Sequence, residues 1–93
     1  MASKLLSFYQ FRSLPLQRKI RQLRNGAVDL GLGIICPFTH TRLYAYHDFY
    51  VESVIDRASG VVLDARPFKS MNRLAPYLEL VCIQEIAILL SLR

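Results

Sequence analysis

Apolar residues recur with a helical period early in the chain. Ser13 is a typical N-cap residue, and Pro15 loses no hydrogen bond in a first turn, where N–H groups have no helical partner. Gly26 can adopt the left-handed conformation that ends many helices. The pattern predicts a helix over about residues 14–24. Three residues spaced four and three apart form its apolar face: Leu16, Ile20 and Leu23.

The next segments are typical of strands. Residues 27–35 alternate in part, and we expect Gly31 and Gly33 to weaken or bulge this strand. Residues 36–40 indicate a loop, and residues 41–46 predict a second strand.

Residues 49–66 give the clearest hairpin signal. We expect a loop of three residues, Ala58–Gly60, with Gly60 in the left-handed conformation. This register pairs residues across the hairpin as follows: Arg57 with Val61, Ile55 with Leu63, Ser53 with Ala65 and Glu52 with Arg66. It also gathers apolar side chains on one face: Phe49, Val51, Ile55 and Leu63. The other face carries Asp56 and Asp64.

The C-terminal third is strongly apolar. Ser70 can cap a short turn over residues 71–75, which we expect Pro76 to end or kink. Residues 78–92 predict a helix, or a strand followed by a helix. As a helix, this segment has a polar face that is narrower than that of a helix which buries only one side. We therefore predict a second chain across it, most simply in a homodimer, with Ile88 and Leu92 at the contact.

Together these elements predict an α+β fold. We expect a small antiparallel sheet of three to four strands, with a basic amphipathic helix near the N-terminus and an apolar helix at the C-terminus. Residues 1–93 form a single domain, and the pattern leaves open whether residues 1–12 are ordered.

Composition narrows the class of protein. Apolar residues make up 53% of the 93 positions, enough to offset chain entropy, so disorder is not expected. Cys36 and Cys82 form no disulfide framework, and we expect both to be reduced core residues of a cytoplasmic protein. No apolar run reaches the roughly 20 residues that span a bilayer, and the N-terminus lacks the pattern of a signal peptide.

Positive charge is concentrated at the N-terminus. The formal net charge is +5, but residues 1–28 contain six basic residues and no acid. Such a segment can be an organelle presequence, a solvated helix face or a phosphate-binding surface. For the last alternative the candidate contacts are Arg18, Arg21 and Arg24, with bases stacking on three tyrosines: Tyr44, Tyr46 and Tyr50.

Catalytic and metal-binding patterns are weak. Cys36, His40 and His47 match no familiar zinc spacing, and a Cys–His pair alone is a minimal nucleophile signal. The carboxylates on the strands are explained as solvated surface residues and not as an acid/base pair. Gly31 and Gly33 are explained by a bulge, because the other residues of a phosphate-binding loop are absent. We therefore expect no catalytic residue, no bound metal and no cofactor.

Four short segments carry a resemblance to a known group. They are Asp48–Glu52, Ser59-Gly60, Arg66–Ser70 and Leu74–Leu78, in a chain of similar length, together with the preceding helix. The chain resembles, over about residues 14–86, a group of small uncharacterised bacterial α+β proteins with an aromatic hairpin followed by a Pro-Tyr-Leu segment. The resemblance implies the fold and no chemistry.

Two functions remain as hypotheses. The first is a non-enzymatic protein–protein interaction or assembly module that self-associates. The alternative is a nucleic-acid- or ribosome-associated accessory protein that uses the basic helix around residues 14–24. Neither hypothesis places the protein in a membrane.

Overall fold

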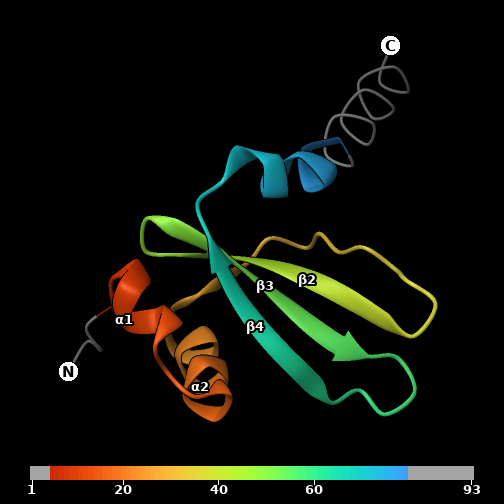
Figure 1. Ribbon diagram of the computed structural model, residues 1–93, viewed down its shortest axis with the longest axis horizontal. Coiled ribbons are helices and arrows are strands. Elements are labelled where there is room, and N and C mark those ends of the chain that lie inside the picture. The colour runs from red at the N-terminus through yellow and green to blue at the C-terminus, as the bar shows by residue number, and fades with distance from the viewer. Residues whose placement is uncertain (1–4, 80–93) are drawn as a thin grey trace.

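The computed structural model describes residues 5–79. Its strands form one antiparallel sheet in chain order, β1-β2-β3-β4. The fold is therefore α+β, as predicted. In Figure 1, α1 and α2 lie apart from the helical residues 71–79, on a different part of the sheet. The elements are α1 (Phe8–Arg12), α2 (Leu16–Gly26), β1 (Val28–Asp29), β2 (Thr39–Tyr46), β3 (Phe49–Asp56) and β4 (Val62–Phe68).

The sheet has one apolar cluster on each face. We call them the N-helix face, which packs against α1 and α2, and the C-helix face, which packs against residues 71–79. Alternation along the strands explains the division, since successive side chains point to opposite faces. The N-helix face buries Phe11, Leu23, Tyr46, Phe49, Val51 and Ala65. The C-helix face buries Leu43, Phe68, Leu74 and Tyr77.

Helix α1 begins at a capping box. The backbone N–H of Gln10 donates to the Ser7 hydroxyl, and the Ser7 N–H donates to the Gln10 side chain. Ser13, predicted as the N-cap of the next helix, is instead the C-cap of α1, and its hydroxyl donates to the Tyr9 carbonyl at 2.7 Å. The N-cap of α2 is Pro15, which has no side-chain oxygen for capping.

Gly26 does not adopt the left-handed conformation that the sequence predicted. It is the last residue of α2, and Ala27 is the C-cap. Its role is close packing. A Cβ at this position would lie 2.7 Å from the Leu5 side chain and 3.4 Å from the Tyr46 ring.

β1 is shorter than predicted because the chain bulges after it. Only Val28 and Asp29 pair regularly with β2, and Gly31 then takes a left-handed φ of 71°. Hydrogen bonds to β2 resume further on, where the N–H groups of Leu43 and Thr41 donate to the carbonyls of residues 32 and 34. A side chain at Gly33 would collide with the Thr41 carbonyl oxygen. The two glycines thus lie in the irregular part of this strand, as predicted.

The β3–β4 register is partly as predicted. Glu52 pairs with Arg66 and Ser53 with Ala65, and Gly60 has a left-handed φ of 75°. The predicted pairing of Ile55 with Leu63 is wrong, because Ile55 pairs with Val62. The predicted pair of Arg57 with Val61 is also wrong.

A longer loop causes this shift. The Asp56 N–H donates to the Val61 carbonyl at 2.9 Å, so residues 57–60 form a loop of four residues instead of three. The Asp56 carboxylate accepts from the N–H and the hydroxyl of Ser59, which holds the loop in this shape. Leu63 is then the extra residue of a bulge and is 51% exposed, so it does not join the apolar face.

The last described segment is a helix. Ser70 caps it through the Asn72 N–H, as predicted, but the helix runs through Pro76 to residue 79. Pro76 is exposed, so water can satisfy the carbonyl that its ring leaves without a donor. Cys82, Ile88 and Leu92 lie outside the described residues.

Candidate functional site

Helix α2 presents a group of four basic side chains. Arg18, Arg21 and Arg24 are exposed, and Lys19 is half-buried. Within residues 5–79 none of the four belongs to an ion pair, since the pairs found there involve other residues. Arg18, Arg21 and Arg24 follow at intervals of three, so they are neighbours along the helix surface.

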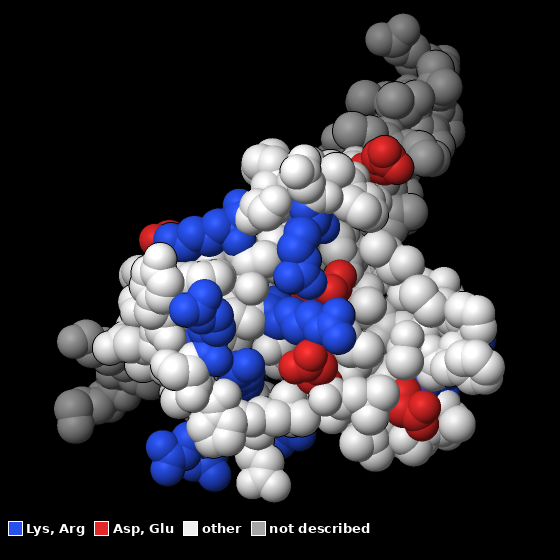
Figure 2. All heavy atoms as spheres, viewed as in Figure 1, with Lys and Arg blue, Asp and Glu red and all other residues white. Residues whose placement is uncertain are grey.

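A second group of cations, over β4 and its neighbours, is paired. Figure 2 shows basic side chains gathered there with acidic side chains between them. Arg66 Nε lies 2.8 Å from an Asp64 oxygen, and this hydrogen bond lowers the pKa of the Asp64 carboxyl. Arg73 lies 3.2 Å from Glu52, and Lys69 lies 3.5 Å from Asp48. Because each of these cations has an acidic neighbour, its positive charge is partly compensated.

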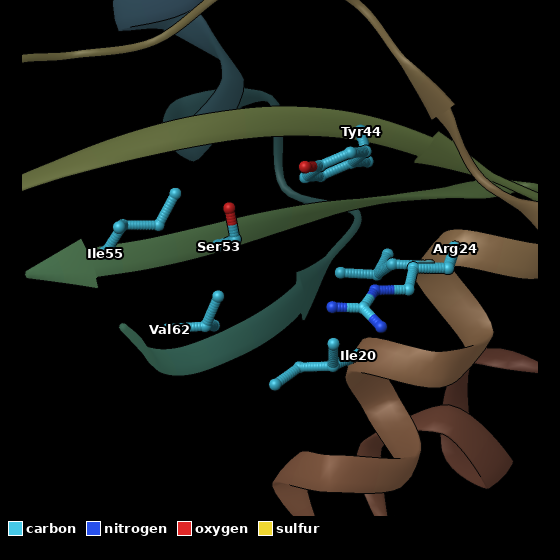
Figure 3. Close-up of a pocket in the computed structure, with 7 residues that line it drawn as sticks. Ile20, Arg24, Tyr44, Ser53, Ile55 and Val62 are labelled. Carbon is cyan, nitrogen blue, oxygen red and sulfur yellow. The ribbon is translucent and has the colours of Figure 1, made fainter. Parts of the chain in front are cut away.

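A cleft lies between α2 and the N-helix face. It has a volume of about 230 Å³. Figure 3 shows Ile20 and Arg24 reaching from α2 toward side chains of β2, β3 and β4. The lining residues are Ile20, Leu23, Arg24, Tyr44, Ser53, Ile55 and Val62.

The three tyrosines proposed for base stacking do not form one platform. Tyr44 lines the cleft, whereas Tyr46 is fully buried against Phe11 and Phe49. Tyr50 lies on the C-helix face, where its ring stacks on Phe68 at 5.9 Å between centroids. Tyr50 pairs with Ala45, the residue next to Tyr46 in β2. Because successive side chains of a strand point to opposite faces, Tyr50 lies on the face opposite Tyr46.

The C-helix face contains a partly buried polar network that the sequence analysis missed. The Tyr77 hydroxyl donates to Glu52 Oε2 at 2.6 Å and lies 2.6 Å from Thr41 Oγ1. Burial, followed by the hydrogen bond to Glu52, raises the pKa of the Tyr77 phenol. Tyr77 is therefore a neutral donor that fastens residues 71–79 to β2 and β3. In the sequence, the network is indicated only by the strand alternation that places Thr41 and Glu52 on the same side of the sheet.

The structure separates the two histidines that were considered as metal ligands. His40 and His47 lie at opposite ends of β2, and His47 sits in the turn with a left-handed φ of 52°. Cys36 is exposed, so its assignment to the core is wrong for this residue. Among residues 5–79, no three His, Cys, Asp or Glu side chains are grouped as metal ligands.

Exposed apolar side chains mark the end of the sheet opposite the β2–β3 turn. Ile35 is 76% exposed and Phe38 is 83% exposed. Arg57 joins their segment to the β3–β4 loop, since its side chain donates to the Cys36 carbonyl at 2.9 Å and its N–H to the Phe38 carbonyl at 3.0 Å. We call this end the sheet tip. A shallow hollow of about 350 Å³ lies there, lined by Pro37, Phe38, Asp56, Arg57 and Ala58.

Within the described part of the chain, no helix combines the length and the apolar character that a membrane crossing requires. Comparison of the chain with protein-family models, with curated protein sequences and with solved structures found no match.

Proposed function

We propose that the protein is a non-enzymatic interaction module that binds a second copy of itself through the sheet tip. The exposure of Ile35 and Phe38 carries this proposal. Two large apolar side chains in water forgo roughly 1.5–3 kcal/mol of burial free energy each. A partner surface that covers them recovers this free energy.

The chemistry of the sheet tip favours a copy of the same chain. A two-fold contact joins one patch to itself, so the patch must be self-complementary. The projecting Phe38 side chain lies beside a hollow, and Asp56 and Arg57 place opposite charges next to each other. The Asp56 carboxylate is charged at neutral pH, and the hydrogen bonds from Ser59 lower its pKa further. Each copy can therefore offer both halves of two contacts. One is an aromatic ring and a hollow to receive it, and the other is a carboxylate and a guanidinium of opposite charge.

The sheet edges do not favour pairing by strand addition. On β4, Pro67 has no N–H, and the Ala65 N–H donates to the Asp64 side chain at 2.8 Å. On the other edge, β1 contains two residues and ends in a bulge. Short, interrupted edges of this kind resist pairing with another chain. Exposed side chains at the sheet tip are the proposed means of contact, with Ile88 and Leu92 as the further contact that the sequence predicts.

The first prediction tests the sheet tip. Sedimentation at micromolar concentration should give a dimer mass, and Phe38→Glu should weaken the dimer by roughly 30-fold or more, as expected at an interface hot spot. Val28→Glu is the matched control, because Val28 is 63% exposed and lies near the opposite end of β2. A monomeric wild-type protein would refute self-association. A dimer that resists Phe38→Glu and dissociates with Ile88→Glu would move the contact to the C-terminal segment.

Nucleic-acid binding is the second candidate, supported by the unpaired cations of α2. We expect the triple variant Arg18→Glu, Arg21→Glu, Arg24→Glu to abolish salt-dependent retention on immobilised RNA. The loss of about three phosphate contacts should reduce the salt slope by about 3. Lys69→Glu is the control, since Lys69 already faces Asp48. Retention that survives the triple change would exclude α2 as the binding surface.

A further inference from the structure

The floor of the cleft under α2 holds a polar side chain in an apolar position. Ser53 is 3% exposed and lies on the N-helix face between Val51 and Ile55, where apolar side chains would otherwise continue. Its hydroxyl makes a long hydrogen bond of 3.5 Å to the Arg42 carbonyl. A bond of this length is weak, so the hydroxyl keeps most of its capacity to bind another group.

The charge of the cleft is positive. Arg24 is the only residue with a charged side chain among the seven that line it, and within residues 5–79 it has no acidic partner. The neighbouring Arg42 is different, because it is held 2.7 Å from Asp29. In Figure 3 the Arg24 guanidinium extends from α2 along one wall of the cleft, while Tyr44 and Ser53 line it from β2 and β3.

The remaining walls are aliphatic. Ile20 and Leu23 come from α2, Ile55 from β3 and Val62 from β4. Pockets for drug-sized ligands usually have volumes of roughly 300–1,000 Å³. The cleft has about 230 Å³, so it suits a smaller molecule. One end of that molecule must be apolar and the other must be an anion able to accept several hydrogen bonds.

We propose that this cleft binds a small amphipathic carboxylate, with its aliphatic body between Ile20, Ile55 and Val62 and its carboxylate on Arg24. A guanidinium matches a carboxylate in a planar, two-bond geometry. The hydroxyls of Tyr44 and Ser53 can donate to the same anion or to a polar group beside it. Aliphatic walls and a single aromatic side chain favour this ligand over a nucleobase, which needs rings on which to stack.

The test uses the full chain and hexanoate as the probe. Methyl signals of Ile20, Ile55 and Val62 should shift on titration in nuclear magnetic resonance spectra, while those of Ile35 at the sheet tip should not. Hexanol, of the same chain length but without charge, should bind about tenfold more weakly or worse, because a hydrogen bond to a charged group is lost. Arg24→Gln should weaken hexanoate binding by a similar factor. Arg18→Gln, on the same helix but outside the lining, should leave it unchanged.

Several outcomes would overturn the proposal. Equal binding of hexanol and hexanoate would show a merely apolar cleft, and equal binding of inorganic phosphate would show a merely cationic one. Equal effects of Arg24→Gln and Arg18→Gln would show a general response of α2 to anions. Tighter binding of N-acetyl-leucine than of hexanoate would assign the cleft to the C-terminus of a polypeptide. None of these results depends on whether the protein forms a dimer through the sheet tip.

Discussion

Replacing Phe11 with alanine should lower the free energy of unfolding by about 3–5 kcal/mol, the usual cost of removing a buried aromatic ring. Phe11 is fully buried, and its ring centroid lies 5.2 Å from that of Tyr46 and 5.7 Å from that of Phe49. Aromatic pairs of this geometry contribute about 0.5–1.5 kcal/mol beyond the burial of their area. A small domain has a total stability of roughly 5–15 kcal/mol, so this variant should be close to unfolding.

Tyr9 provides a matched control for Phe11. It lies in the same short helix and is 70% exposed, so Tyr9→Ala removes a ring of similar size with little loss of packing. Urea denaturation followed by circular dichroism measures both variants. We expect Tyr9→Ala to change the free energy of unfolding by less than about 1 kcal/mol. A loss below 1 kcal/mol for Phe11→Ala as well would show that α1 does not belong to the core.

Local patterns predicted the hairpin better than its loop. The alternation around Glu52 and Arg66 predicted their pairing, because a slip of the register by one residue mixes polar and apolar side chains on one face. The loop depends instead on the hydrogen bonds between Asp56 and Ser59, and alternation carries no information about them. The error at Ile55 and Leu63 follows from this one extra loop residue.

Contacts between distant segments were harder to foresee. α1 contains five residues, too few for a helical period to stand out, and its position depends on the cluster around Phe11 and Tyr46. The Tyr46 hydroxyl joins two further segments, since it accepts from the Leu6 N–H at 2.9 Å and donates to Gln22 at 2.9 Å. Such contacts follow from the packing of the whole chain and not from the spacing of neighbours.

In the candidate site, too, local spacing could be predicted from the sequence, whereas contacts between distant segments could not. The three arginines of α2 were found from their spacing alone, but the cleft joins residues of α2 to three strands. Ser53 was counted only as a partner of Ala65, because a serine in a strand is ordinary in the sequence. Its meaning appears once β3 places it in the same cleft as Arg24 and Tyr44.

Tyr77 should be the residue that matters most on the C-helix face. Tyr77→Ala removes a fully buried ring and should lower the free energy of unfolding by about 3–5 kcal/mol. Tyr77→Phe keeps the ring but leaves Glu52 and Thr41 without the hydroxyl that lies 2.6 Å from each. This smaller change should cost about 1–3 kcal/mol, the range for a hydrogen bond to a charged group and for a buried polar atom left without its partner. Tyr9→Phe, at an exposed ring, should cost nothing measurable.

Alkaline pH tests the same network without a change in packing. Burial and the Glu52 hydrogen bond raise the pKa of Tyr77 in the folded protein, whereas an unfolded tyrosine ionises near pH 10. The stabilisation is therefore fully present below about pH 10 and declines as the pH rises above it, by up to roughly 1.4 kcal/mol per pH unit. Urea denaturation between neutral pH and pH values above 10 should show this decline in the wild-type protein. Tyr77→Phe should remove the part of the slope that belongs to Tyr77, whereas Tyr9→Phe should retain it. An unchanged slope in Tyr77→Phe would show that the phenol does not fasten the helix to the sheet.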